Sequence, residues 1–225
     1  MGSAVGEILP LGVGVAVSPA PILAVILMLL SRRAKRNAPA FLAGWIVGLA
    51  VVGVIVLVIS SGADVATYDE RSTVASAVRA LLGVLLLFLA WRHWQSRPEE
   101  DEETQMPRWM QRMESVNPAM ALGLGVLLSG LNPKDTTLTI FAAGAIAQAG
   151  LSAGESAVTL AVFIAIATTS VVAPITLYFA LGERAEETLN GWKAWLTENN
   201  ATVMAVLFLI FGVVLVGQGI RGLGS

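Results

Sequence analysis

The residues best suited to chemistry in this sequence are Lys134 and Asp135, which interrupt an apolar run from Pro118 to Gly150. A charge inside a bilayer costs on the order of a few kcal/mol and is kept mainly where it faces a cavity or a partner. Because side chains on adjacent helical residues point about 100° apart, we do not expect the two to form a single ion pair facing one way. We predict that Lys134 holds an anionic headgroup, while Asp135 titrates and couples transport to protons.

Two proline-containing breaks, Ser18-Pro19-Ala20-Pro21 and Asn132-Pro133-Lys134-Asp135, share one pattern. In each, a residue that caps helices well precedes a proline at the first helical position, so each break is predicted to start a half-helix inside the membrane. Asp135 then falls at the third helical position, and the two N-termini together would favour an anion. The alternative is that Asp135 only caps a kinked helix and that Lys134 extends to water. The predicted substrate-binding residues are Ser18, Pro19, Pro21, Ser129, Asn132, Pro133, Lys134, Asp135 and Thr136.

The composition indicates the medium in which these breaks lie. The chain is 56% hydrophobic and 13% charged, about half the charged fraction of a water-soluble domain. Six apolar runs are long enough for helices that cross a ~30 Å hydrocarbon core, and none alternates with the two-residue period of a barrel strand. The predicted fold class is an all-α polytopic membrane protein with six transmembrane helices, of which helices 1 and 4 are broken. The runs are Glu7 to Leu30, Pro39 to Ser61, Val74 to Trp94, Pro118 to Gly150, Glu155 to Leu181 and Ala201 to Ile220.

A polar stretch, residues 95–117, divides the spans into two sets of three, in residues 1–94 and 118–225. The spacing of Gly12 and Gly14 from Ser18 matches that of Gly123 and Gly125 from Ser129. Because each half has three spans, the second enters the membrane in the opposite sense, and the halves are predicted to be inverted repeats. The stretch itself is predicted to be an acidic cytoplasmic linker followed by a helix in the membrane interface. The linker acids are Glu99 to Glu103, the interfacial pattern is Trp109, Met110, Met113 and Val116, and a similar pattern between spans five and six is Leu189, Trp192, Trp195 and Leu196.

The loop charges predict the orientation. With both termini outside, the cytoplasmic segments hold ten of the 14 Lys and Arg residues, as the positive-inside rule requires. We therefore expect a multi-pass protein of the plasma membrane. Residues 31–36, with four cations, are predicted to determine this topology, and contact with anionic lipid is the alternative.

The sequence lacks the residues that several classes of function require. Zero cysteines exclude disulfides and thiol chemistry. The lone histidine, His93, has no metal-ligating partner pattern and is predicted to lie at the interface. With no recognisable nucleophile-base set and no nucleotide-binding motif, we expect no enzyme, no catalytic residue, no metal, no cofactor and no nucleic acid. Gly44 and Gly48 predict close packing with a neighbouring helix or, alternatively, a subunit contact such as a homodimer.

The six spans in two halves, the early proline break, the charged central loop and Asn132-Pro133-Lys134 together resemble the lysine-exporter (LysE) superfamily. Within it, Ser18-Pro19-Ala20-Pro21-Ile22 and Asn132-Pro133-Lys134-Asp135 are similar to the GAP family, also called peptidoglycolipid- or sulfolipid-addressing (Sap) proteins. The resemblance implies export of envelope glycolipids or related lipids toward the cell surface. Other branches of the superfamily export amino acids and metal cations.

Three functions follow as hypotheses. The first is a secondary transporter of an anionic lipid or glycolipid, in contact with membrane lipids. The second is a proton-coupled exporter of a small polar solute, an amino acid or a cation. The third is a non-transporting assembly subunit of an envelope-lipid export machinery. A site open sideways to lipid would favour the first hypothesis, and a sealed pocket the second.

Overall fold

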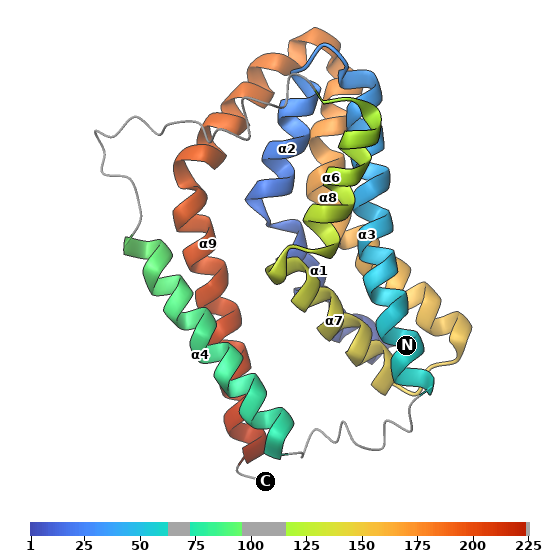
Figure 1. Cartoon of the computed structure of the whole chain (residues 1–225), viewed down its shortest axis with the longest axis vertical. Helices are drawn as coiled ribbons and strands as arrows, with labels where there is room; N and C mark the ends of the chain where they lie inside the picture. Colours follow the sequence, from blue (N-terminus) through green and yellow to red (C-terminus); the bar gives the residue numbers. More distant parts are fainter. Residues whose placement is uncertain (63–72, 96–115, 224–225) are drawn as a thin grey trace. The chain divides into compact units, whose positions relative to one another are not determined.

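A computed structural model of the chain describes residues 1–62, 73–95 and 116–223. These residues form α-helices and one short 3-10 helix, and no strand occurs among them. The elements are α1 (Gly2–Ala16), α2 (Pro19–Leu29), α3 (Ala34–Gly62), α4 (Thr73–Gln95), α6 (Pro118–Gly130), α7 (Pro133–Gln148), α8 (Ala153–Leu181), η2 (Gly182–Arg184) and α9 (Ala185–Leu223) (Figure 1).

The helices have the length and composition of a membrane protein. Three of them, α3, α8 and α9, are long and apolar enough to cross a bilayer. The pair α1 and α2 passes the same test as one span that bends by 52°. The all-helical membrane class is therefore confirmed with three to four candidate spans among the described residues, whereas the arrangement of six spans stays a prediction.

Both predicted breaks are where helices end and begin. α1 ends at Ala16 and α2 begins at Pro19, while α6 ends at Gly130 and α7 begins at Pro133. Proline has no N–H for the preceding turn and a fixed φ that suits the first position of a new helix. The local sequence therefore fixes each break.

One compact unit comprises the described residues within Met1–Ser61 and Gln105–Trp195, which include both breaks. In it α8 packs along α1 and α2, and α7 packs against α1 (Figure 1). Gly12 brings α1 close to α8, since a Cβ there would lie 3.1 Å from Ile166 Cγ2. Gly44 and Gly48 bring α3 against α6, because a Cβ at Gly44 would overlap the carbonyl oxygen of Leu122. The predicted packing face of Gly44 and Gly48 is thus occupied within the same chain.

The second unit comprises the described residues within Gly62–Thr104 and Leu196–Ser225, which are α4 and the C-terminal part of α9. These two helices approach closely at glycines. A Cβ at Gly83 would lie 2.9 Å from the oxygen of Gly212, and one at Gly212 would lie 3.1 Å from the oxygen of Gly83. Near the end of α4, the His93 ring contacts the Phe208 ring with centroids 5.4 Å apart and the ring planes tilted by 49°. Each unit combines helices from both halves of the sequence, and the division into repeats 1–94 and 118–225 stays a prediction.

The pattern predicted to form a separate interfacial helix between spans five and six is helical but not separate. α9 runs unbroken from Ala185 to Leu223, with Leu189 buried and Trp192 exposed. Residues 193–200 connect Trp192 to the last span and include Asn199 and Asn200. They contain no proline or glycine that would end the helix. The acidic run Glu99 to Glu103 and most of the other interfacial pattern, Trp109, Met110 and Met113, lie outside the described residues.

Candidate functional site at the two helix breaks

At the second break, the sequence folds as its capping pattern predicts. Asn132 precedes α7, and its side-chain oxygen accepts a hydrogen bond from the Lys134 N–H at 3.1 Å. Pro133 occupies the first helical position, and the Thr136 N–H donates to the Asn132 carbonyl at 2.9 Å. Asp135 is therefore at the third helical position, as predicted.

At the first break, the backbone of Ser18 has nearly the same dihedral angles as that of Asn132, but the Ser18 side chain has a different hydrogen-bond partner. Ser18 has φ −74° and ψ 116°, close to the −69° and 116° of Asn132. Its hydroxyl does not cap α2 and instead donates to Asp135 Oδ1 at 2.7 Å, across 117 residues of sequence. Pro19 and Pro21 have no N–H, so the first turn of α2 has lost two of the donors that an anion would use.

Lys134, which belongs to the second break, also contacts the first break. Its Nζ lies 3.0 Å from Asp135 Oδ1 and donates to the carbonyl oxygen of Gly14 at 2.7 Å. Gly14 is in the last turn of α1, where carbonyls lack helical partners and the helix dipole is negative. The expectation that Lys134 and Asp135 would not form a single ion pair facing one way is wrong. The angle of about 100° describes only where the two side chains leave the helix, and the lysine side chain is long enough for its Nζ to reach Asp135 Oδ1.

The pair is shielded from solvent. The side chain of Asp135 is 0% exposed and that of Lys134 is 7% exposed. Asp135 Oδ1 is shared by Ser18 and Lys134, whereas Oδ2 is buried with no hydrogen-bond partner among the described residues. Lone pairs of a buried carboxylate without partners are costly, so Oδ2 marks a position where a donor or a proton would be stabilised.

The remaining predicted residues play two structural parts. Thr136 Oγ1 donates to the Gly130 carbonyl at 2.8 Å and so ties the end of α6 to the start of α7. Ser129 is buried but bonds back to the Gly125 carbonyl at 2.9 Å and packs against Gly48, away from the Lys134 contacts. The structure thus brings together Ser18, Lys134 and Asp135, flanked by Asn132 and the prolines.

One hydrogen-bond acceptor in the site, the Gly14 carbonyl, could not be predicted from the sequence. The Gly14 carbonyl belongs to the Gly12 and Gly14 pattern noticed for its spacing, yet a backbone oxygen cannot be recognised as a ligand from residue type. No cluster of three or more His, Asp or Glu side chains that could hold a metal ion occurs in the part of the chain that the structure describes.

Comparison with known proteins identifies the family. The family model described as Sap, sulfolipid-1-addressing protein, matches residues 8–221, which is nearly the whole chain. No curated protein and no solved structure matches significantly. The chain therefore belongs to the sulfolipid-1-addressing protein family.

Proposed function

We propose that this member of the Sap family is a secondary transporter that exports an anionic lipid or glycolipid toward the cell surface, and that it is not an enzyme. The observation that carries the proposal is the buried Lys134–Asp135 pair where two broken helices meet. A buried ion pair adds little stability, because desolvation offsets the attraction. Charges kept within membrane helices instead mark substrate and ion pathways. The family description adds a sulfolipid as the class of cargo.

In this proposal the charge balance of the site couples the cargo to protons. The pair is neutral, so an anion that binds Lys134 leaves an unbalanced negative charge on Asp135 among apolar groups, which is unfavourable. A proton on Asp135 restores neutrality. One proton and one negative charge therefore enter the site together, and Asp135 Oδ2, which has no partner among the described residues, is the position for that proton.

The surroundings of Asp135 contain no other charge that would perform this role. Among the helices packed around it, α2 and α6 carry no charged residue, and α1 carries only Glu7, which is exposed near its start. α8 carries only Glu155, an exposed residue of the first turn that bonds to Ser152. Lys134 is thus the one charge that faces Asp135 within the described residues.

The contacts also connect charge to helix movement. Ser18 and Gly14 flank the first break. In the polar contacts of the site, Ser18 is bonded to α7 through Asp135, and Gly14 is bonded to α7 through Lys134. When a proton and an anion occupy these two side chains, the polar ties between α1, α2 and α7 are released. Such a two-state junction is what alternating access needs.

We extend the proposal to the architecture: six spans in two inverted repeats, both termini outside, within the LysE superfamily and in the plasma membrane. Two observations support it. α3, which follows the α1–α2 pair, packs on α6 through Gly44, and α8, which follows the α6–α7 pair, packs on α1 at Gly12. The helix that follows each broken pair therefore lies against the first helix of the other pair. The second unit likewise pairs α4 with α9, the third span of each half.

The proposal is tested by reconstituting the full chain in liposomes with labelled sulfated glycolipid, phosphatidylglycerol or lysine, with and without a pH gradient. We expect Lys134→Ala to slow movement of the anionic lipids at least about tenfold, since a bound charge loses its partner. Asp135→Asn should keep movement and lose its dependence on pH. Thr137→Val is the matched control, because Thr137 is one residue from Thr136 but bonds only to its own helix, at the Pro133 carbonyl.

If both site variants match the wild type while remaining folded, the mechanism is wrong. Because Lys134→Ala leaves a buried carboxylate unpaired, Lys134→Arg is included to keep the charge. A folded Lys134→Arg protein that transports, beside a folded Lys134→Ala protein that does not, supports the anion role.

A second candidate, export of a small polar solute, is favoured by one observation. The Lys134–Asp135 pair is closed off, with exposures of 7% and 0%, as in a sealed pocket. Movement of lysine but of neither lipid in the same liposomes would establish this candidate in place of the first.

A further inference from the structure

We propose that the basic segment 32–36 forms a binding surface for the headgroups of anionic phospholipids, separate from the site at the helix breaks. The segment comprises the end of the turn after α2 and the first residues of α3, and four of its five residues are cations: Arg32, Arg33, Lys35 and Arg36. With Pro118 and Tyr178 they line a pocket of about 660 Å³. The inference does not depend on transport, because it concerns binding at equilibrium.

The cations are held in place by buried neighbours. Ala34 is buried in the middle of the segment, and the Asn37 amide donates to the Val116 carbonyl at 2.8 Å, which fixes the segment beside the start of α6. The four charged side chains themselves are exposed. Within the described part of the chain none of them has an ion-pair partner, so their charge is available to a ligand.

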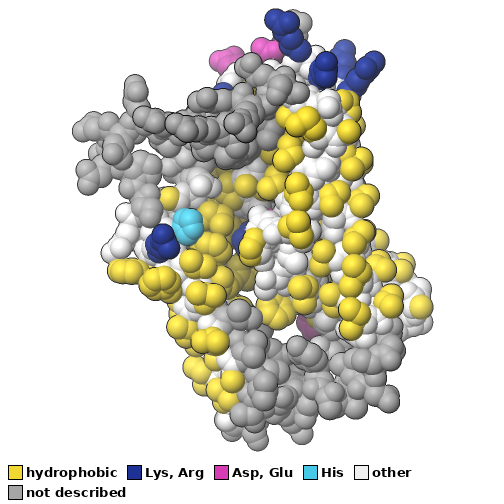
Figure 2. Space-filling model, viewed as in Figure 1, with side chains coloured by type: hydrophobic (Ala, Val, Ile, Leu, Met, Phe, Trp, Pro, Cys, Tyr) yellow, Lys and Arg dark blue, Asp and Glu magenta, His cyan; other side chains and the backbone are white. Residues whose placement is uncertain are grey.

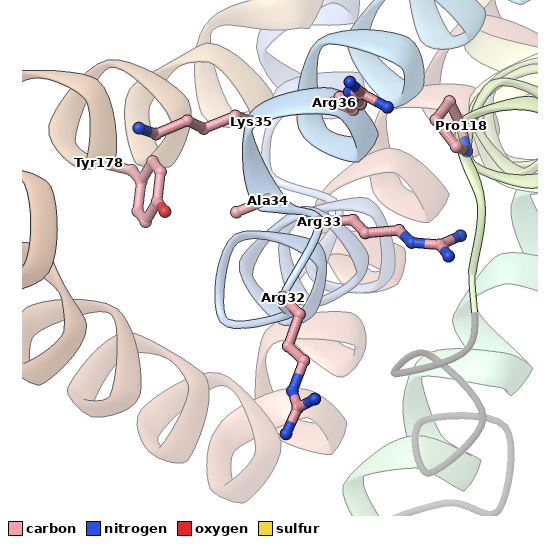
Figure 3. A pocket seen from close by; sticks show the side chains of 7 residues that line it. All are labelled: Arg32, Arg33, Ala34, Lys35, Arg36, Pro118 and Tyr178. Atoms are coloured by element: carbon pink, nitrogen blue, oxygen red, sulfur yellow. The ribbon is translucent and has the colours of Figure 1, made fainter.

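The directions of the side chains indicate the size of the ligand. Figure 3 shows Lys35 extending toward Tyr178, Arg33 and Arg36 extending toward the side of Pro118, and Arg32 pointing away from the others. The cations therefore spread around the pocket and do not converge on one point. That arrangement suits several phosphate groups at a lipid surface better than a single small anion.

Apolar surface next to the cations indicates a lipid. Phe179 and Leu181, which follow Tyr178 in α8, are half exposed, and so are Met120 and Leu122, which follow Pro118 in α6. Figure 2 shows several Lys and Arg side chains together at one end of the face in view, near Asp or Glu side chains, and hydrophobic side chains covering the helices beyond them. A phospholipid would place its phosphate on the cations and its acyl chains along the apolar side chains, whereas a soluble anion would use only the first.

The test measures binding of phosphatidylglycerol and phosphatidylcholine to the purified full chain in detergent micelles, by native mass spectrometry. The wild type should retain phosphatidylglycerol more strongly than phosphatidylcholine. Arg33→Gln with Lys35→Gln removes one cation from the side of Pro118 and one from the side of Tyr178. It should weaken retention of phosphatidylglycerol about tenfold or more, since each basic residue near an anionic headgroup adds to its attraction. Solubilised protein has no sidedness, so a change of membrane orientation cannot produce this result.

The matched control is Arg184→Gln with Lys193→Gln, which removes the same charge outside the pocket and should change retention less than about twofold. Equal loss in both double variants, or no loss in the pocket variant, would overturn the proposal. Displacement of phosphatidylglycerol by millimolar inorganic phosphate would also overturn it, in favour of a site for soluble anions. The pocket double variant should lose the same fraction of phosphatidylglycerol retention whether position 134 is lysine or alanine, and this separates the surface from the site proposed for transport.

Discussion

At the break between α1 and α2, Ser18 has φ −74° and ψ 116°, and at the break between α6 and α7, Asn132 has φ −69° and ψ 116°. The backbones are nearly the same, yet the side chains act differently. Asn132 caps its own helix, whereas Ser18 leaves its helix uncapped and bonds to Asp135 of the other break.

The two breaks also differ in the charges that they contribute to the site. The second break supplies both Lys134 and Asp135, while the first supplies neutral partners, the Ser18 hydroxyl and the Gly14 carbonyl. The two breaks are therefore complementary halves of one site, built on a shared backbone. Each break thus has a proline start, and only the second carries charged side chains.

The largest expected effect comes from separating the charges. Lys134→Met leaves Asp135 buried and unpaired, which should lower the free energy of unfolding by about 3–5 kcal/mol. Lys134→Met combined with Asp135→Leu removes both charges and should restore most of that stability. Denaturant unfolding in mixed micelles measures both variants, and a double variant no more stable than Lys134→Met would contradict the account of the pair.

A second comparison concerns the glycines that bring a neighbouring helix to each break. A Cβ at Gly125 would overlap the Phe41 carbonyl and lie 2.7 Å from the Trp45 nitrogen, both backbone atoms of α3. A Cβ at Gly12 would meet side-chain atoms instead, with Ile166 Cγ2 at 3.1 Å and Phe163 Cδ2 at 3.5 Å. We expect Gly125→Ala to destabilise by about 3 kcal/mol and Gly12→Ala by about 1 kcal/mol or less, because backbone cannot move aside. Equal losses in thermal unfolding would show that the two helix contacts are equally tolerant.

The smallest effects distinguish the two residues that precede the prolines. Ser18→Ala removes a buried hydrogen bond to a carboxylate and should cost about 2 kcal/mol, while Asn132→Ala removes a helix cap and should cost about 1 kcal/mol. Only Ser18→Ala should also alter the pH dependence of transport, since only Ser18 contacts Asp135. An altered pH profile in Asn132→Ala and not in Ser18→Ala would reverse these roles.

The sequence predicted the local parts of this site and missed its long-range contacts. The positions of Asn132, Pro133 and Asp135 in the first turn of α7 follow from capping rules that act over a few residues. The bond from Ser18 to Asp135 spans 117 residues and depends on how α1 and α7 pack, which no local pattern specifies. The hydrogen bond from Lys134 to the Gly14 carbonyl was missed for the same reason, since it also depends on how α1 packs against α7.

For the fold, the sequence predicted helix positions better than helix ends. All the predicted apolar runs contain described helices, and both breaks are correct to the residue that begins the new helix. α9 was not predicted as one helix, because the interfacial pattern from Leu189 to Leu196 and the span from Ala201 to Ile220 were interpreted as separate elements, although nothing between them stops a helix. The polarity of a segment indicates whether it lies in lipid, in the protein interior or in water. Where a helix ends depends instead on capping residues, prolines and glycines.

The most direct test of the central claim counts the protons that enter with the anion. Calorimetric titration of the purified protein with a short-chain sulfated glycolipid, in buffers of different ionisation enthalpy, gives the number of protons bound per molecule. At a pH where Asp135 is ionised, we predict uptake of about one proton by the wild type and none by Asp135→Asn, which should still bind. Binding without proton uptake by the wild type, or equal uptake by Asp135→Asn, would contradict a shared site for a proton and an anion.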